Sequence, residues 1–322
     1  MPRLSVIMPA FNAEKFVIEA IDSVLQQSMS DFELLIVDDC STDNTFSLLS
    51  SIKDSRVSVF RNEVNKGYLQ ACNFLFQQAK GLFVTFQDAD DLSDRMRFEK
   101  QLKFLEVHPH CGACGSRALY FRDNIRDVVR YKDVNLAHNE ILAGLFHQNQ
   151  FCGASVMVRK SILEQTGYYR EFFDRIGNED YDLFFRIAQR HPVGNLDEYL
   201  YHVRLTNNSI SRVLRSPRQY ISKDIVIFLA IQRRMHDIDS LSGYDEKPLQ
   251  EYADTLLAPF MKDASLLDRK NADLASYNNE RKTALFFSFK AVRRSPFQFI
   301  NWKYLVVETL RTCRWWIQMR SV

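Results

Sequence analysis

Short apolar runs and amphipathic stretches alternate over the first third of this chain. The runs at Leu4–Met8 and Phe32–Val37 are apolar except for Ser5 and Glu33, and the run at Phe32–Val37 suits a strand buried on both faces of a parallel sheet. Between them, apolar residues recur at helical spacing. Such alternation predicts a doubly wound α/β sheet, mixed but mainly parallel and flanked by helices. In this part we expect strands at 4–8, 32–37, 57–60 and 82–86, and helices at 13–27, 41–51, 67–80 and 93–107.

The pattern is less regular further on. We expect strands at 111–121, 152–158 and 196–204 and a helix at 179–190, followed by mostly helical, more polar sequence. This predicts a catalytic domain over residues 1–215 and a helical C-terminal extension over residues 216–322. No G-x-G-x-x-G follows the first strand and no G-x-x-x-x-G-K occurs, so dehydrogenase and P-loop kinase functions lose their main support.

Acidic clusters follow two of the predicted strands. Asp38 and Asp39 come after the second strand, and Asp88, Asp90 and Asp91 come after the fourth. Carboxyl ends of parallel strands meet at one edge of a sheet, where such folds bind their ligands, so the clusters should lie near each other. Converging carboxylates suit a hard divalent cation, Mg²⁺ or Mn²⁺, which takes its other ligands from phosphates and water. The alternative is that these residues only form turns and cap helices.

Five motifs in order resemble the family-2 glycosyltransferases with the GT-A-type nucleotide-sugar fold. The resemblance covers roughly residues 4–212, and its specificity comes from the order and spacing of the pieces. The motifs are Ser5-Val-Ile-Met-Pro9-Ala-Phe-Asn12, Val37-Asp-Asp-Cys-Ser-Thr-Asp43, Asn65-Lys-Gly67, Asp88-Ala-Asp-Asp91 and Glu179-Asp-Tyr-Asp-Leu183.

The resemblance implies a site for the donor, a nucleotide sugar that is a UDP-sugar in many members. Asp39 matches the carboxylate that binds uracil, and Asp38 is its neighbour. Asp90 and Asp91 are the expected metal ligands within the motif that contacts ribose and diphosphate. The other residues expected at the donor or substrate site are Pro9, Phe11, Asn12, Lys66, Gly67, Asp88, Glu179 and Arg204.

Asp180 matches the catalytic base of the family. A sugar hydroxyl is a poor nucleophile, and a carboxylate within hydrogen-bond reach can take its proton during attack. A metal on the departing diphosphate then suffices for one in-line displacement with inversion at the anomeric carbon. Asp182 is the rival base, and an ordinary acidic first turn of the helix is the alternative to both. The expected acceptor is a hydroxyl of a glycan or a lipid-linked glycan.

One position departs from the family pattern. Relatives often end the domain with Tyr-Arg-x-His, whose His can touch the metal or diphosphate, whereas here Thr206 follows Arg204 at that place. Arg204 either pairs with the diphosphate or makes a salt bridge, and His202 is a possible substitute for the missing ligand. Two other functions therefore stay open: a degenerate transferase that acts as a binding or assembly subunit, and a nucleotidyltransferase of similar fold.

Basic and aromatic residues concentrate at the C-terminal end. The last 42 residues hold nine Lys or Arg and one acid, whereas the whole chain has a formal charge of only +2. An acidic body with a basic tail is not the pattern of a nucleic-acid binder. Residues 296–322 either lie in an anionic membrane interface or pack on the catalytic domain or a partner. With no signal-like N-terminus, we expect a cytoplasmic protein, with peripheral contact to the inner face of the cell membrane as one alternative.

Overall fold

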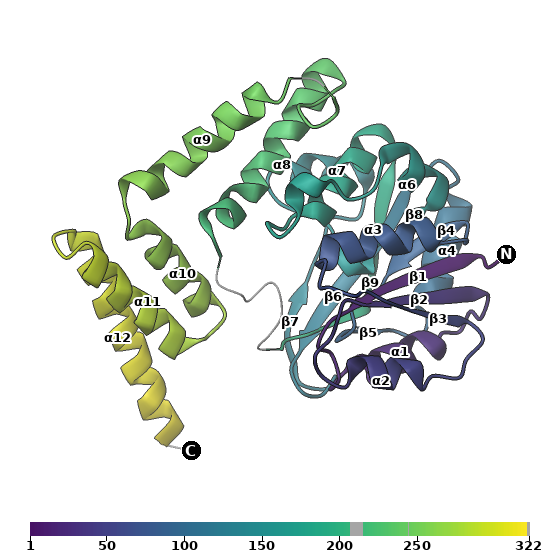
Figure 1. Ribbon diagram of the computed structural model, residues 1–322, viewed down its shortest axis with the longest axis horizontal. Helices are drawn as coiled ribbons and strands as arrows, with labels where there is room; N and C mark the ends of the chain where they lie inside the picture. The colour runs from purple at the N-terminus through teal and green to yellow at the C-terminus, as the bar shows by residue number, and fades with distance from the viewer. Residues whose placement is uncertain (207–214, 244, 321–322) are drawn as a thin grey trace. The chain divides into compact units, whose positions relative to one another are not determined.

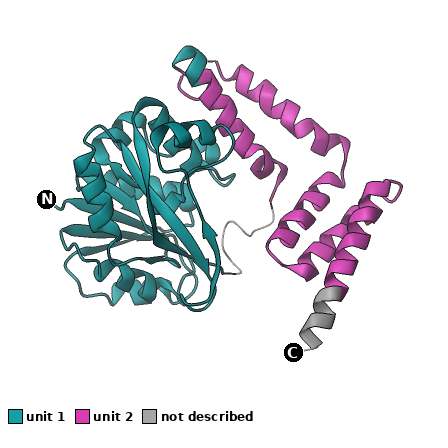
Figure 2. Cartoon of the chain, turned by 180° about the vertical axis from the view of Figure 1, so that it is seen from behind, with its two compact units in different colours: residues 1–205, 233–237 teal, residues 206–232, 238–322 magenta. Residues whose placement is uncertain are grey.

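The computed structural model describes residues 1–206, 215–243 and 245–320, and side chains are described as far as residue 313. The chain divides into two compact units, shown in two colours in Figure 2. Unit 1 comprises residues 1–205 and 233–237, and unit 2 comprises residues 206–232 and 238–322. The proposed domain boundary at residue 215 stays a prediction.

Within the described part of unit 1, nine strands form one sheet (Figure 1). Their order is β3-β2-β1-β4-β8-β6-β9-β5, with β7 paired to β6. The pairings from β3 to β4 are parallel, and β8 then runs antiparallel to β4. This confirms the predicted doubly wound, mixed sheet. The strands are β1 (Leu4–Ala10), β2 (Phe32–Asp38), β3 (Val57–Arg61), β4 (Phe83–Phe86), β5 (Leu92–Ser93), β6 (Ala113–Phe121), β7 (Val128–Lys132), β8 (Met157–Arg159) and β9 (Val193–Arg204).

Helices cover both faces of the parallel half, because alternate residues of each strand point to opposite faces. Leu4, Val6 and Met8 of β1 pack in one core cluster with residues of α1, α2 and α4. On the other face, Phe86 of β4 makes edge-to-face contacts with Phe76 of α3 and Phe184 of α7. The helices of this unit are α1 (Val17–Leu25), α2 (Thr45–Ser50), α3 (Tyr68–Gln78), α4 (Arg97–Val107), α5 (His138–Leu145), α6 (Lys160–Thr166) and α7 (Glu179–Arg190), with short 3-10 turns η1 (Gly153–Ser155) and η2 (Glu171–Phe173).

Several predicted boundaries are wrong for local reasons. The helices expected from residues 41 and 93 begin at Thr45 and Arg97, because acidic side chains hold the preceding turns. Asp43 accepts the Thr45 N–H at 2.9 Å, and Asp94 accepts the Met96 N–H at 2.9 Å. The strand expected at 152–158 starts with the turn η1 instead. The elements β5, β7, α5 and α6 were not predicted.

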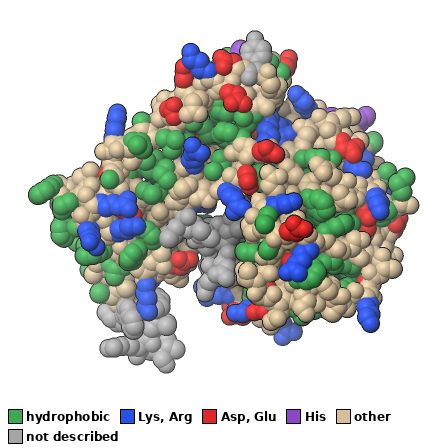
Figure 3. Space-filling view, in the orientation of Figure 1, with side chains coloured by type: hydrophobic (Ala, Val, Ile, Leu, Met, Phe, Trp, Pro, Cys, Tyr) green, Lys and Arg blue, Asp and Glu red, His purple; other side chains and the backbone are tan. Residues whose placement is uncertain are grey.

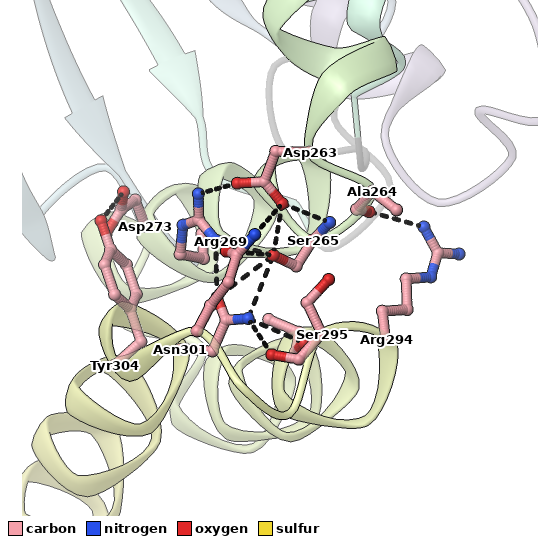
Figure 4. Close-up of polar contacts among 11 residues, drawn as sticks. Asp263, Ala264, Ser265, Arg269, Asp273, Arg294, Ser295, Asn301 and Tyr304 are labelled. Atoms are coloured by element: carbon pink, nitrogen blue, oxygen red, sulfur yellow. Dashed lines mark hydrogen bonds and ion pairs between the residues drawn. The ribbon is translucent and has the colours of Figure 1, made fainter.

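Unit 2 is helical, as expected. Its helices include most of α8 (Pro217–His236), then α9 (Lys247–Lys262), α10 (Leu266–Tyr277), α11 (Arg281–Arg294) and α12 (Phe299–Arg320). A buried polar cluster joins α10 to the start of α12 (Figure 4): Arg269 donates to Asp263, Ser265 and Asn301. Burial opposes ionisation of Asp263, but hydrogen bonds from Ser265 and Arg269 lower its pKa to about 2. Among the helices of the described residues, none has the length and apolar character needed to cross a bilayer.

Candidate active site

The sheet brings three strand ends to one edge. Ala10 at the end of β1 lies beside Asp38 at the end of β2, and Ile7 of β1 pairs with Phe86, the last residue of β4. The backbone joins the following loops as well, since the Asp39 N–H donates to Ala10 O at 2.8 Å and the Gln87 N–H to Ile7 O at 2.9 Å. The two acidic clusters therefore both lie at the carboxyl edge of the sheet, as the strand order β3-β2-β1-β4 requires.

Asp39 organises the turn that follows β3. Its Oδ1 accepts hydrogen bonds from Asn62 Nδ2 at 2.7 Å and the Lys66 N–H at 2.9 Å, and its Oδ2 accepts the Gly67 N–H at 2.8 Å. Gly67 has φ of +92°, a conformation that only glycine adopts readily. Asp39, Lys66 and Gly67, which the sequence assigns to the same site, thus form one hydrogen-bonded unit.

The loop after β1 is fixed to the loop after β2. Asn12 has a left-handed backbone with φ of 50°; its N–H donates to Ser41 Oγ, and its Oδ1 accepts the Thr42 N–H at 2.8 Å. The preceding Phe11 is 48% exposed. Pro9 is opposite Val37 in the β1–β2 register, so the rigid proline is part of the strand rather than the loop.

The neighbouring Asp38 is fully buried. Its Oδ2 accepts the Ser41 N–H at 3.3 Å and pairs with Arg61 at 3.4 Å. Its Oδ1 has no hydrogen-bond partner among the described residues. Asp38 therefore stabilises the end of β2, while Asp39 stabilises the turn that follows β3.

The acidic loop after β4 is anchored by tyrosines and by β9. Tyr68 OH donates to Asp88 Oδ1 at 3.2 Å, and the Asp88 N–H donates to Tyr201 OH at 3.0 Å. Asp91, 3% exposed, accepts the Arg204 N–H on Oδ1 at 2.7 Å. Burial and the charge of Asp90 raise the pKa of Asp88 to about 7 and raise that of Asp91 well above its usual value. A bound cation would relieve this crowding of like charges.

Arg97 is a buried cation beneath this loop that the sequence reading missed. The side chain is fully buried and donates to Thr85 Oγ1, Phe86 O and Ala154 O. Its charge also acts on Asp88. In the sequence, Arg97 is a single arginine beside the apolar stripe of the predicted helix. An arginine at that position is ordinarily a surface residue, so nothing in the sequence indicates that it is buried.

Glu179 and Asp180 open α7, as predicted, where the helix dipole favours carboxylates. Burial and the Asp180 charge raise the pKa of Glu179 to about 8, and the charge of Asp88 contributes. Burial also raises the pKa of Asp180, whose Oδ1 accepts the Tyr181 N–H at 2.7 Å and whose Oδ2 accepts Asn149 Nδ2 at 3.1 Å. Arg97 joins Phe86 O at the end of β4 to Ala154 O, and a Cβ atom on the adjacent Gly153 would lie 2.3 Å from Asp180 Oδ2. The end of β4 and the start of α7 are therefore close together.

Asp182, the rival base, has a different environment. It is fully buried and forms ion pairs with Arg186 at 2.8 Å, Arg170 at 3.3 Å and Arg233 at 3.8 Å. A carboxylate held by three guanidinium groups in the protein interior is not available to an acceptor hydroxyl. The structure therefore assigns Asp182 to the support of α7.

Arg204 lies in the interior between two aromatic rings, Phe16 and Phe121. Its guanidinium donates to Asp90 O at 2.9 Å, to Asp123 O, and to Glu19 at 2.6 Å. Together with its backbone bond to Asp91, these contacts hold the acidic loop in place. His202, by contrast, has Nε2 3.1 Å from Tyr199 O, and burial lowers its pKa.

The metal expectation fits the donor set of the loop after β4. Within the described residues, no group of three or more His, Cys, Asp or Glu side chains forms a ready-made metal site. A cation held by one or two carboxylates would need its remaining ligands from a substrate diphosphate and water, which is the usual coordination of Mg²⁺. The crowded carboxylates of Asp88 and Asp90 are suited to such a shared site.

A doubly wound, mixed sheet with acidic groups at its carboxyl edge matches the fold of GT-A-type glycosyltransferases. The model of "Glycosyl transferase family 2" matches residues 5–167, and the chain belongs to this family. EpsE of Bacillus subtilis (strain 168), named as a glycosyltransferase, is 32% identical over 237 residues, which are 72% of this chain and 83% of that protein. The predicted enzyme class is thus confirmed, in preference to a nucleotidyltransferase.

One further relative and two solved structures are also similar to this chain. The Escherichia coli protein named UDP-Glc:alpha-D-GlcNAc-diphosphoundecaprenol beta-1,3-glucosyltransferase WfaP is 26% identical, over 59% of this chain and 72% of that protein. The crystal structure of S. aureus TarS 1-349 in complex with UDP-GlcNAc has a TM-score of 0.62 at 20% identity, covering 91% of this chain and 81% of that one. Mannosyltransferase PcManGT from Pyrobaculum calidifontis, in complex with GDP-Man and Mn²⁺, has a TM-score of 0.54 at 19% identity, covering 99% and 84%.

Proposed function

We propose that this enzyme is an inverting, metal-dependent transferase that moves a sugar from a nucleotide sugar to a hydroxyl of a glycan or lipid-linked glycan. The observation that carries the proposal is the convergence of two acidic groups with separate tasks. Asp88 and Asp90 follow β4, while Glu179 and Asp180 open α7, and their charges act on one another. One group suits the cation on the leaving diphosphate, and the other suits the incoming acceptor.

The donor is a UDP-sugar in this proposal. WfaP is named for a UDP-Glc donor and a diphosphoundecaprenol acceptor, and TarS binds UDP-GlcNAc in its crystal structure. Asp39 and the Lys66–Gly67 turn supply the base subsite, and Pro9, Phe11, Asn12 and Asp38 surround it. Three of the roughly four acceptor positions of the Asp39 carboxylate are already used within the protein, which leaves one for a uracil N–H.

Of the two expected metal ligands, Asp90 is the direct ligand in this proposal, and Asp91 supports the loop that carries it. The Asp91 carboxylate is buried and bound to the backbone of Arg204, so its role is to fix the loop. Mg²⁺ or Mn²⁺, when bound, supplies positive charge to the departing diphosphate. Arg204 holds the same loop through Asp90 O. Asp180 takes the proton from the acceptor hydroxyl as it attacks, and Glu179 borders the acceptor beside it.

A donor screen tests the proposal. Binding of UDP-glucose, UDP-GlcNAc and GDP-mannose is measured by calorimetry with Mn²⁺, with Mg²⁺ and with EDTA, and transfer is measured to a panel of p-nitrophenyl glycosides. We expect metal-dependent binding of a UDP-sugar and transfer with inverted anomeric configuration. Metal-dependent binding without transfer to any acceptor would favour the alternative, a degenerate transferase that acts as a binding subunit. The observation that supports this alternative is Thr206, which stands where relatives often have a histidine.

The Asp90→Ala variant should lose affinity for the donor in the presence of metal by roughly tenfold or more. Removing the carboxylate takes away a cation ligand, so the loss should vanish when both proteins are compared in EDTA. Asp127→Ala is the matched control, since Asp127 is an exposed carboxylate of the β6–β7 connection. Calorimetric titration of the three proteins with UDP-sugar measures the effect, and an equal affinity of Asp90→Ala and wild type in Mn²⁺ would contradict the metal assignment.

The C-terminal helix presents its apolar side outward, as the proposed membrane contact requires. On α12, Phe299, Trp302, Val306 and Leu310 are between 48% and 81% exposed, while the polar residues Asn301, Glu308 and Thr312 are buried. Hydrophobic side chains and basic ones are interleaved over α11 and α12 (Figure 3). Exposed aromatic residues among lysines and arginines suit an anionic lipid surface. The predicted contributions of Arg314, Ile317 and Arg320 lie outside the described side chains.

Vesicle co-sedimentation tests this contact. The full chain should sediment with phosphatidylglycerol-containing vesicles and not with pure phosphatidylcholine, and the Trp302→Ser, Leu310→Ser double variant and deletion of residues 296–322 should lose most of the binding. Met261→Ser is the control, because Met261 is an 85% exposed apolar residue elsewhere in unit 2. Unchanged sedimentation of the double variant and the deletion would rule out the contact at α12.

A further inference from the structure

The carboxylate of Asp180 rests against a segment far from it in sequence, residues 149–153. Asn149 Nδ2 donates to Asp180 Oδ2 at 3.1 Å. A Cβ atom on Gly153 would lie only 2.3 Å from the same oxygen, so the absence of a side chain at Gly153 makes room for the carboxylate. The segment therefore fixes where Asp180 Oδ2 lies, from one side by a hydrogen bond and from the other by contact with backbone.

A lysine side chain contacts the backbone of this segment directly. The Phe151 peptide lies between Asn149 and Gly153; its N–H donates to Asn149 Oδ1 at 3.0 Å, and its carbonyl accepts a hydrogen bond from Lys132 Nζ at 2.6 Å. Phe151 is fully buried, and Lys132, the last residue of β7, is half-buried. Neither β7 nor this lysine was predicted, yet the chain of contacts from Lys132 through Phe151 and Asn149 ends at Asp180.

We propose that Lys132 is a positioning residue for Asp180, acting through the Phe151 peptide and Asn149, and that Gly153 is required for the same carboxylate position. The inference rests on the proposed function, because it matters only if Asp180 takes the acceptor proton. A general base works when its oxygen lies within hydrogen-bond reach of the proton it removes, so a small displacement of Oδ2 lowers turnover rather than donor affinity.

The positive charge of Lys132 also affects the Asp180 carboxylate. Burial raises the pKa of Asp180, and the Lys132 ammonium is among the groups that lower it again, with the Tyr181 N–H and Asn149. The other ionisable neighbours are acidic: Glu179 on the same helix and Asp88 on the loop after β4. Lys132 is thus the cation that opposes these two carboxylates at the base, while its geometric role is independent of any titration.

Steady-state kinetics of Lys132→Met and Lys132→Arg test the inference, with the donor found in the screen and a p-nitrophenyl glycoside acceptor. Lys132→Met should lower kcat by roughly ten- to hundredfold, a part of what a general base contributes. The calorimetric affinity for the donor should stay unchanged. Lys132→Arg should recover most of the lost kcat, because a guanidinium can also donate to Phe151 O. Arg130→Met removes a positive charge from an exposed position of the same strand and should keep the wild-type kcat.

The possible outcomes distinguish the proposed role of Asp180 as the base from the positioning role of Lys132. If Asp180→Asn keeps full transfer, the proposed base is wrong whatever Lys132 does. If Asp180→Asn is inactive but Lys132→Met turns over like wild type, only the positioning role is overturned. Equal losses in Lys132→Met and Arg130→Met would also overturn it, by pointing to the charge of the whole hairpin. Should Lys132→Met fail to fold, Gly153→Ala serves instead: unchanged kcat there would overturn the inference, since its Cβ must displace Asp180 Oδ2.

Discussion

Transfer by an Asp180→Asn variant should fall by about a hundred- to ten-thousandfold, the usual contribution of a general base. Asparagine has nearly the same shape, and its oxygen can still accept the Tyr181 N–H that Asp180 Oδ1 accepts at 2.7 Å. The amide cannot take a proton from the acceptor hydroxyl. The Tyr181 hydrogen bond therefore stays in place, although the amide nitrogen that replaces Oδ2 cannot accept from Asn149 Nδ2. Because we assign neither Tyr181 nor Asn149 to the donor site, the donor should bind the variant as it binds wild type.

Two measurements on the same preparation check this. Calorimetry should give a donor affinity within about threefold of wild type, and single-turnover transfer should give the rate loss, since that rate is independent of product release. Glu171→Gln is the control, because Glu171 is an exposed carboxylate in the turn η2 near the start of α7. A variant that transfers sugar at the wild-type rate would mean that another group, or water, takes the proton.

The sheet was predictable because its signals are repeated and local. The four parallel strands are short, mainly apolar runs, and each is separated from the next by a helical stripe, so the element order and the carboxyl edge follow from sequence. The short pairings beyond β4 depend on contacts between distant segments. β5 has only two residues, and its partner is Tyr201–His202 of β9, more than a hundred positions away. No local period could indicate such a pair.

The acidic residues of the candidate site, and the Lys66–Gly67 turn bound to Asp39, are the part that sequence patterns indicate. Carboxylates at the ends of strands are visible in sequence, and the placement of Asp38, Asp39 and Asp88 by β2 and β4 follows from the fold. Residues that act through backbone atoms leave no comparable signal. Arg97 binds carbonyl oxygens of Phe86 and Ala154, and Lys132 binds that of Phe151. Their role comes from which peptides they reach, which only the tertiary structure gives.

Asp182 shows how a motif position can be read two ways. In sequence it stands two residues after the proposed base, on the same helix. In the structure it is the centre of an ion cluster with Arg170, Arg186 and Arg233. Arg186 also donates to Thr166 O, Gly167 O and Tyr168 O, so the cluster ties α7 to the loop that begins after α6. Asp182, two residues from the proposed base, thus stabilises the helix that carries it.

Asp182→Asn should destabilise unit 1 by about 3–5 kcal/mol, the usual cost of breaking a buried ion pair by removing one partner. The reason is that Arg186 and Arg233, both 6% exposed, would keep their charges without the carboxylate that balances them. The matched control is Glu164→Gln, which breaks the more exposed i,i+4 pair of Lys160 and Glu164 on α6 and should cost less than about 1 kcal/mol.

Hydrogen exchange is the appropriate measurement for this prediction. All three tryptophans of the chain stand at position 302 or later, so tryptophan fluorescence reports on unit 2 and not on unit 1. Amides in the middle of α7 exchange through unfolding of unit 1, and their exchange free energy should drop by the predicted amount in Asp182→Asn while amides of α10 and α11 keep theirs. If the exchange free energy drops no more in Asp182→Asn than in Glu164→Gln, the three arginines are stabilised without Asp182. Packing alone would then hold the helix that carries Asp180.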